Sequence, residues 1–488
     1  MSKKLPNQKT DFSSWYTQVV NKAGLADYGP VKGTMVIKPY GFQLWENIKS
    51  VFDKMIKKSG HVNAYFPLFI PKSFLAQEAE HVEGFAKECA IVTHTRLKSD
   101  PEKGVVVDPE SKLDEEIIVR PTSETVIWAM YKKWIQSYRD LPILINQWAN
   151  VVRWEMRTRL FLRTSEFLWQ EGHTAHATYE EAEEEALSIL ELYRQLAEEY
   201  LAIPVITGLK TETEKFAGAD KTYCIEAMMG DKRALQAGTS HNLGQNFAKA
   251  FGVRYQNKDN KDEYVWATSW GISTRLVGAV ILAHGDNKGL RLPPKIAPIQ
   301  VIIIPIFKNE QEAINVKQFI EPIVSGVIQK GFRVQVDWTD NSPGFKFNEW
   351  EMKGVPLRIE VGPRDIKQNN LVFVRRNEFG KENISADKAV SIIPEILDSI
   401  QNDLYSQALD FRQKNTYKIN SYEEFKKIIK NGGFVRCGWD GSKSTENKIK
   451  EETRATIRCI PFDEEPKNRI CIFSGDPAKH EVIFARAY

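Results

Sequence analysis

The stretch NVVRWEMRTRLFLRTSE, residues 150–166, places charged side chains inside a pattern that is otherwise typical of a buried strand. Its apolar members are expected to lie in a core, and these are Val151, Val152, Trp154, Phe161 and Leu162. Arg153, Glu155 and Arg163 stand among them. Because a buried charge must be paired or must meet a charged ligand, the stretch predicts a strand pair that presents two arginines and a carboxylate to a ligand. The basic segment 156–160 is expected to be the loop between the strands.

Arginines in this arrangement suit the chemistry of phosphate groups. The planar guanidinium fork binds phosphate oxygens through paired hydrogen bonds, and fixed cations stabilise the charge of a phosphoryl transition state. If segment 156–160 forms a hairpin, Arg153 and Arg163 face one pocket, and Arg275, expected near the start of a helix, can add a third cation. Taken singly, each arginine has the alternative of an ordinary surface salt bridge.

Length and composition are those of a globular protein with several domains. The chain has 488 residues, 42% of them hydrophobic and 27% charged, and its net charge of +3 is too small to indicate nucleic-acid binding over the whole surface. No apolar run reaches the length of a membrane span, and the N-terminus lacks the apolar core of a signal peptide. Five scattered cysteines without a CxxC pair favour a reducing compartment, so we expect a cytoplasmic protein.

Helical and strand patterns follow each other irregularly in the first 290 residues. Apolar residues at helical spacing predict a helix over 41–60, and a strand follows over 61–71, where Pro67 and Pro71 confine it to an edge or a bulge.

Further along, Thr178 and Glu181 form a capping-box pattern that opens a helix through residue 200, and a strand is expected over 263–272. Residues 1–290 are therefore predicted to form an α+β domain, with a largely antiparallel sheet flanked by helices.

Two smaller domains are predicted after residue 290. Residues 298–405 show a βαβ rhythm that predicts an α/β domain, with strands over 300–307, 332–338, 357–363 and 371–376 and a closing helix over 389–400. Residues 406–488 form a lysine-rich segment that carries the last three cysteines, and we expect it to be a small α+β domain.

Several of these segments resemble the signature elements of prolyl-tRNA synthetases, of the class II, archaeal and eukaryotic-like type without an inserted editing domain. Residues 41–71, 146–173 and 269–286 are similar to class II motifs 1, 2 and 3. The stretches RPTSET (120–125) and ALQAGTSHNLGQNF (234–247) are similar to segments specific for proline. The resemblance implies ATP-dependent attachment of L-proline to tRNA-Pro through prolyl-adenylate, and a homodimer formed through the motif 1 region.

The resemblance also assigns an ATP site, with Mg²⁺ as the accompanying ion. It implies that Arg153 contacts the α-phosphate and the proline carboxylate, and that Glu155 meets the adenine end. Arg163 and Arg275 are expected to bind the outer phosphates and stack on the base, and with Arg153 they are the expected catalytic residues. Gln236, Thr239 and Ser273 match the remaining ATP-binding positions.

A proline site is implied beside it. The secondary ammonium of proline needs a carboxylate and a hydrogen-bond acceptor, which Glu124 and Thr122 offer, and the pyrrolidine ring needs an apolar wall. The resemblance places His241 at the substrate, Trp169 and Phe216 in the wall, and Glu171 and His173 behind it. For the two histidines, a structural role is the alternative.

The domain at 298–405 resembles the anticodon-binding domain of class IIa synthetases. Its candidates for reading bases are Lys346, Glu351, Arg358 and Arg364, with a solvated lysine-rich face as the alternative.

Two other functions have to be weighed. Threonyl-tRNA synthetases select their substrate with a zinc ion held by one cysteine and two histidines, but RPTSET contains no cysteine. A synthetase-like binding protein without catalysis would lack the motif 2 and motif 3 arginines, which are present here.

The C-terminal domain is predicted to hold no structural zinc. Relatives bind zinc there with four cysteines in two short clusters, whereas Ser442 and Phe473 stand here where the partners of Cys437 and Cys471 would be. Possible substitutes are Cys459, Asp440 and His480, but two thiolates alone forfeit most of the binding free energy. The terminal Tyr488 is expected to fold back toward the catalytic domain, as in the family.

Overall fold

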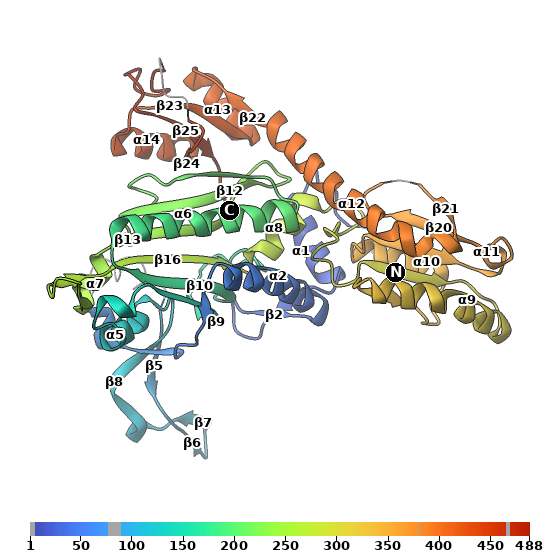
Figure 1. Cartoon of the computed structure of the whole chain (residues 1–488), viewed down its shortest axis with the longest axis horizontal. Coiled ribbons are helices and arrows are strands. Elements are labelled where there is room, and N and C mark those ends of the chain that lie inside the picture. Colours follow the sequence, from blue (N-terminus) through green and yellow to red (C-terminus); the bar gives the residue numbers. More distant parts are fainter. Residues whose placement is uncertain (1–4, 77–88, 379, 465–468) are drawn as a thin grey trace.

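The computed structural model describes residues 5–76, 89–378, 380–464 and 469–488. Figure 1 shows a large sheet in the middle, an α/β domain at one end and the C-terminal segment beside the sheet. The central sheet has eleven strands, in the order β22-β23-β25-β24-β11-β12-β13-β16-β10-β9-β3. None of the described helices combines the length and the apolar character that a membrane crossing requires.

The part of this sheet formed by the first 290 residues is antiparallel except at its edge, as predicted. It contains β9 (Ile143–Val152), β10 (Glu166–His176), β11 (Val205–Leu209), β12 (Lys221–Met228), β13 (Ala234–Gly244) and β16 (Trp266–Ser273), all paired antiparallel. The edge strand β3 (Val62–Asn63) pairs with β9 in parallel. One face of the sheet is covered by α6 (Tyr179–Gln195), whose Tyr193 donates a hydrogen bond to Gln170 Oε1 of β10 at 2.8 Å.

The predicted helices form where their patterns place them. Helix α2 (Pro39–Lys58) buries Leu44, Ile48, Phe52 and Ile56, which recur every four residues and so lie on one face. Helix α6 begins at the predicted capping box, in which Thr178 Oγ1 accepts from Glu181 N at 3.2 Å.

The strand predicted over 61–71 is interrupted. It consists of β3 and of β4 (Phe69–Pro71), which belong to different sheets, with Pro67 between them. Both pieces are edge strands, as the two prolines predicted, because proline cannot donate to a second neighbouring strand.

The charged stretch differs from its prediction. Strand β9 ends at Val152 and β10 begins at Glu166, so Arg153 and Arg163 flank the strands and the connection spans 153–165. Trp154, expected in the core, is 48% exposed. Within this connection Phe161 has a φ of +61°, which is not a strand conformation, and Leu160 O accepts a hydrogen bond from Tyr16 Oη at 2.7 Å.

The α/β domain contains a five-stranded sheet in the order β18-β17-β19-β20-β21, with β17 (Val301–Pro305), β18 (Val334–Val336) and β19 (Leu357–Val361) parallel and β20 (Asn370–Arg375) and β21 (Glu382–Ser385) antiparallel. Helices α9 (Glu310–Gln329) and α12 (Ala386–Lys414) pack on it. Helix α12 continues beyond the predicted boundary at 405, and Figure 1 shows it running on to the C-terminal segment.

The C-terminal segment extends the central sheet instead of forming a separate one. Its strands are β22 (Thr416–Lys418), β23 (Phe434–Trp439), β24 (Thr456–Pro461) and β25 (His480–Ala485), and β24 pairs with β11 of the first 290 residues. At its end, Tyr488 Oη donates to Asp231 Oδ2 at 2.7 Å, and the Tyr488 ring lies 5.4 Å from the Arg159 guanidinium. The expected return of Tyr488 to the larger domain is confirmed.

The residues considered as zinc ligands, or standing where a ligand was expected, have other contacts here. Ser442 is the N-cap of α14 (Lys443–Thr453), and its Oγ accepts from Thr445 N at 3.2 Å. Asp440 accepts hydrogen bonds from Ser442 N and Thr445 Oγ1, and Phe473 packs edge-on against Tyr422 at 5.1 Å. Cys437 and Cys471 are buried.

We therefore predict that the C-terminal segment folds without zinc. Protein treated with a chelator and then dialysed against zinc should retain no stoichiometric metal, because helix capping and ring packing occupy the positions that would have to complete a tetrahedral shell. Metal analysis of the dialysed protein checks this, and one tightly held zinc per chain would contradict it.

Candidate active site

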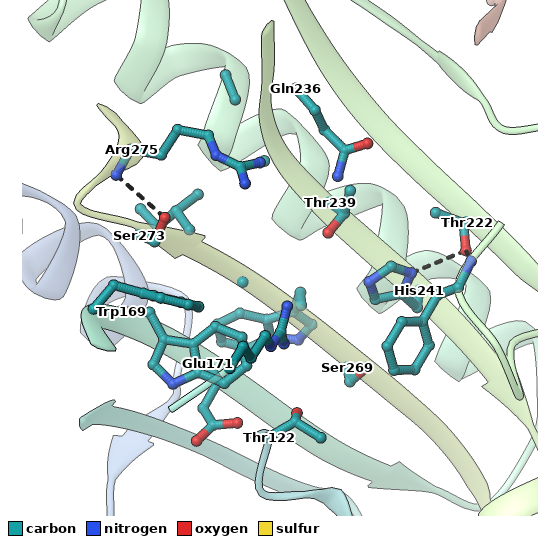
Figure 2. A pocket seen from close by; sticks show the side chains of 18 of the residues that line it. Thr122, Trp169, Glu171, Thr222, Gln236, Thr239, His241, Ser269, Ser273 and Arg275 are labelled. Carbon is teal, nitrogen blue, oxygen red and sulfur yellow. Dashed lines mark hydrogen bonds between the residues drawn. The ribbon is translucent and has the colours of Figure 1, made fainter. Parts of the chain in front are cut away.

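A cavity of about 390 Å³ opens on the face of the central sheet opposite α6. Every side chain predicted to bind ATP or proline lines it, and these are Thr122, Glu124, Arg153, Glu155, Arg163, Trp169, Glu171, His173, Phe216, Gln236, Thr239, His241, Ser273 and Arg275. Figure 2 shows how Gln236, Thr239, Ser273 and Arg275 lie toward one end and Thr122, Glu171 and His241 toward the other.

The end near Arg275 is rich in guanidinium groups. Arg275 is the first residue of α8 (Arg275–His284), its backbone N–H donates to Ser273 Oγ at 3.2 Å, and its Nε donates to Leu162 O at 3.3 Å. Burial and the neighbouring charges of Arg153 and Arg163 lower the pKa of Arg275 to about 10. Burial is the larger cause, and the part due to Arg153 and Arg163 shows positive charges close together, an arrangement that favours an anion.

Arg153 is held in place from two sides. Its Nε donates to Pro121 O at 2.9 Å, and its guanidinium lies over the rings of Phe167 at 5.6 Å and Trp169 at 5.3 Å. The two rings belong to alternate residues of β10 and therefore lie on one face of the strand. Arg163 is half exposed, and its Nε lies 3.5 Å from Glu155 Oε2.

A β-bulge sets the direction of the side chains on β13. Ile225 pairs with Gly238 and Glu226 pairs with Gln236, so Ala237 is the extra residue. Because the bulge reverses the alternation, Gln236 and Thr239 both face the cavity although they are three residues apart.

The other end of the cavity is acidic. Glu124 is the first residue of α5 (Glu124–Trp134), and its Oε2 accepts a short hydrogen bond from Thr122 Oγ1. Glu171 Oε1 accepts from Gln147 Nε2 at 2.7 Å and from Ser123 Oγ at 2.5 Å. The two carboxylates thus stand on one side of the cavity, each fixed by neighbouring donors.

Glu171 also forms a buried ion pair with His173. His173 Nε2 is 3.1 Å from Glu171 Oε2. Burial acts to raise the pKa of Glu171, but the hydrogen bonds from His173, Ser123 and Gln147 outweigh it, and the pKa lies below its usual value. Burial acts in the opposite sense on His173, where Glu171 and Glu124 together raise the pKa.

The pKa of His241 is shifted in the opposite direction to that of His173. Thr222 Oγ1 accepts from Phe216 N at 3.0 Å, which leaves its proton for His241 Nδ1, also at 3.0 Å (Figure 2). Burial lowers the pKa of His241 to about 4, so the ring is neutral at pH 7. The Phe216 ring lies 4.6 Å from the His241 ring, and the two form one wall of the cavity.

Four residues that support the site side chains were not predicted from the sequence. Phe167 supports Arg153, Thr222 orients His241, and Ser123 and Gln147 hold Glu171. Phe167 could have been found, since it is two residues before Trp169 on the same strand. The others act through contacts between distant segments, for which the sequence carries no local signal.

One group of side chains in the described part of the chain has the geometry of a metal site, and it comprises Glu124, Glu171 and His173. Its oxygens already accept hydrogen bonds from Thr122, Ser123 and Gln147. The arrangement is therefore suited to a cationic group that approaches the two carboxylates, while the guanidinium end is suited to phosphates.

The lowered pKa of His241 generates a prediction about stability. Between pH 6.5 and 4 the unfolded chain binds a proton that folded His241 does not, so the free energy of unfolding falls as the pH falls through this window. His241→Gln should remove this contribution, on the order of 2–4 kcal/mol at pH 4, and flatten the curve.

Urea unfolding of both proteins at pH 7, 6, 5 and 4 measures the difference. His284→Gln should act in the same direction, since burial also lowers the pKa of His284 to about 4. Parallel curves for wild type and His241→Gln would contradict the assignment.

Family descriptions match three successive parts of the chain. The tRNA synthetase class II core domain (G, H, P, S and T) matches residues 107–284. The anticodon binding domain matches residues 300–396, and the C-terminal domain of prolyl-tRNA synthetase matches residues 422–488.

Similar proteins match over the full length. The chain is 56% identical to the proline–tRNA ligase of Porphyromonas gingivalis, and the match covers 100% of this chain and 99% of that protein. It is 57% identical to the proline–tRNA ligase of Bacteroides fragilis with the same coverage, and 55% identical to that of Cytophaga hutchinsonii, with 100% of each covered. The chain therefore belongs to the prolyl-tRNA synthetase family of class II tRNA synthetases.

Proposed function

We propose that this chain attaches L-proline to tRNA-Pro in two steps, with ATP as the energy source and prolyl-adenylate as the intermediate. The observation that carries the proposal is a single cavity with an acidic end, formed by Glu124 and Glu171, and a guanidinium end, formed by Arg153, Arg163 and Arg275. The first end suits an ammonium group and the second suits a triphosphate, so both substrates can meet between them.

The acidic end selects proline. Glu124 binds the secondary ammonium together with Thr122, and Glu171 with His173 holds this wall in place. Trp169 and Phe216 enclose the pyrrolidine ring. His241 is neutral, so it adds no positive charge to compete with the ammonium.

The guanidinium end binds ATP. Arg153 belongs to this end, and its bond to Pro121 O brings it beside Thr122, so it can contact both the α-phosphate and the proline carboxylate. Glu155 lies toward the adenine. Arg163 and Arg275 hold the outer phosphates and the base. Gln236, Thr239 and Ser273 complete the site with neutral hydrogen-bonding groups.

Mg²⁺ accompanies ATP in class II synthetases. It keeps several waters and is bound largely through phosphate oxygens, so the protein has to supply few ligands. The carboxylate of Glu155 and the amide of Gln236 are oxygen donors in the cavity that fit this demand. When bound, the ion neutralises charge on the outer phosphates.

The reaction needs no protein nucleophile. The proline carboxylate attacks the α-phosphorus in line, the bond to the bridging oxygen of pyrophosphate breaks, and prolyl-adenylate forms. The arginines position the reactants and neutralise the developing charge. The terminal ribose 3′-hydroxyl of the tRNA then attacks the prolyl carbonyl and releases AMP.

The assembly proposed is a cytoplasmic homodimer. The motif 1 segment exposes Val62, Tyr65 and Phe69, and the Tyr65 side chain is 72% exposed, which supports contact with a second copy there.

The domain division proposed is 1–290, 298–405 and 406–488, with α12 linking the last two.

The anticodon-reading surface differs from the one expected from sequence. Lys346 was a wrong candidate, because its ammonium is buried, donates to Asp337 O at 2.9 Å and lies 3.7 Å from Asp337 Oδ1. Arg358 remains a candidate for reading bases, and its guanidinium lies 4.6 Å from the Phe347 ring. With Glu351 it lines a second cavity of about 370 Å³. We assign base recognition to this cavity.

The activity is tested by ATP–pyrophosphate exchange without tRNA, run with each of the twenty amino acids. Proline should give the highest kcat/KM. Preference for threonine would favour the threonyl relative, and no exchange with any amino acid would favour a non-catalytic binding protein.

Glu124→Gln should raise the KM for proline about ten- to hundredfold in this assay, because a lost hydrogen bond to a charged group costs about 1.5–3 kcal/mol. The KM for ATP should change less than about threefold, since Glu124 stands at the other end of the cavity. Glu110→Gln, at an exposed position, is the control. Equal effects on both substrates would mean that Glu124 is part of the scaffold.

Changing the anticodon of tRNA-Pro should weaken aminoacylation and leave proline activation unchanged. Arg358→Ala should reduce this discrimination, because it removes a guanidinium from the proposed base-reading cavity. Aminoacylation kinetics with native and altered tRNA measure both effects. Indifference of the wild-type enzyme to the anticodon would exclude this role of the domain.

A further inference from the structure

Arg120 is a fully buried arginine directly behind the acidic end of the cavity, and it does not line the cavity itself. Its guanidinium donates three hydrogen bonds, from Nη1 to Phe66 O at 2.6 Å, from Nε to Asn150 O at 2.8 Å and from Nη2 to Asn150 Oδ1 at 3.2 Å. All three acceptors are neutral oxygens. In the part of the chain that the structure describes, Arg120 forms no ion pair with a carboxylate.

A buried guanidinium without a carboxylate is costly, and this cost calls for an explanation. Its carbonyl partners and the Tyr65 ring, 5.6 Å away, reduce the cost but do not remove it. A neutral side chain could fill the same space without desolvating a charge. What it could not do is hold several segments at fixed distances through a planar fork.

Arg120 joins its own segment to two others that are remote in sequence. Its side chain binds the motif 1 segment at Phe66 and the end of β9 at Asn150. Its backbone N–H donates to Leu68 O at 2.9 Å, and its carbonyl accepts from Val152 N at 3.0 Å. Arg120 is therefore fixed to both neighbours through side chain and main chain alike.

Arg120 and its β9 anchor Val152 are both close in sequence to proposed substrate-binding groups. Val152 is followed directly by Arg153, whose Nε donates to the carbonyl of Pro121, the residue after Arg120. Thr122 and Glu124 follow within four residues of Arg120. Loss of the bonds from Arg120 to β9 would consequently let the acidic end and the Arg153 guanidinium shift relative to each other.

We propose that Arg120 is a positioning residue for proline activation, which sets the distance between the Glu124 carboxylate and the Arg153 guanidinium. The inference rests on the proposed roles of Glu124 and Arg153. It assigns Arg120 no contact with substrate. Since a misplacement of about 1 Å can cost on the order of a hundredfold in rate, loss of the fork should be visible in the chemistry even where the fold survives.

Arg120→Lys is the first test, because lysine keeps the charge but cannot reproduce the planar three-way fork. In tRNA-free exchange it should lower kcat/KM for proline by about a hundredfold. The KM for ATP should rise less than the KM for proline, since of the ATP-binding arginines only Arg153 depends on Arg120, and Arg163, Arg275 and Gln236 lie on elements that Arg120 does not contact.

The matched control is Arg333→Lys. Arg333 also donates only to neutral carbonyls, those of Ala297, Pro294 and Lys295, but it lies in the α/β domain. This variant should keep exchange kinetics within about twofold of wild type. Asn150→Ala, which removes the Nη2 acceptor and the bond from Asn150 Nδ2 to Glu166 Oε1, leaves the other two bonds of the fork in place. It provides a milder test if Arg120→Lys does not fold, and should raise the KM for proline more than the KM for ATP.

Chemical rescue separates positioning from mere stability. Millimolar guanidinium added to Arg120→Ala, or to Arg120→Lys if the alanine variant does not fold, should restore part of kcat/KM for proline, and methylammonium should not. The inference is overturned if folded Arg120→Lys keeps wild-type kinetics, if both KM values rise equally, or if guanidinium has no effect. Lack of proline activation by the wild type would instead remove the proposed function itself.

Discussion

The crowding of three guanidinium groups at one end of a cavity is the constraint on which the rest of the structure depends. Arg275 stands at the start of α8, where the helix dipole adds positive charge, and burial together with the charges of Arg153 and Arg163 lowers its pKa to about 10. Such an arrangement is unfavourable without an anion. The fold must therefore hold the arginines in place. In the proposed function, ATP relieves the repulsion already present, and no reorganisation is needed at the moment of reaction.

The sheet provides that rigidity through strand alternation. On β10, Phe167, Trp169, Glu171 and His173 all face the cavity, so one strand runs from the support of Arg153 to the acidic end. The opposite face packs on α6, which fixes the strand from behind. Strand β10 thus fixes the spacing between the rings that support Arg153 and the Glu171–His173 pair.

Much of this could be predicted from sequence, because the signals are local. The capping box at Thr178 and the four-residue spacing in α2 depend on neighbours along the chain, and both are confirmed. The motif residues could be named from the sequence because they stand in stretches that match the family, and they line one cavity in the structure. Their individual roles remain proposals.

What sequence could not supply arises from contacts across the chain. The connection 153–165 contains the positive φ of Phe161 and accepts the bond from Tyr16, and it leaves Trp154 in solvent. The bulge at Ala237 reverses an alternation that a pattern would extend unchanged. Lys346 was expected at the surface, but its side chain is buried and its ammonium donates to Asp337 O, nine residues earlier.

The most direct measurement of the central claim is tRNA-free ATP–pyrophosphate exchange by Arg153→Ala. Losing a charge contact of this kind typically costs about 3–4 kcal/mol, so kcat/KM for proline should fall by a few hundredfold or more. Arg157→Ala, in the same connection but exposed, is the control and should retain near wild-type exchange. Exchange by Arg153→Ala within about threefold of wild type would contradict the account.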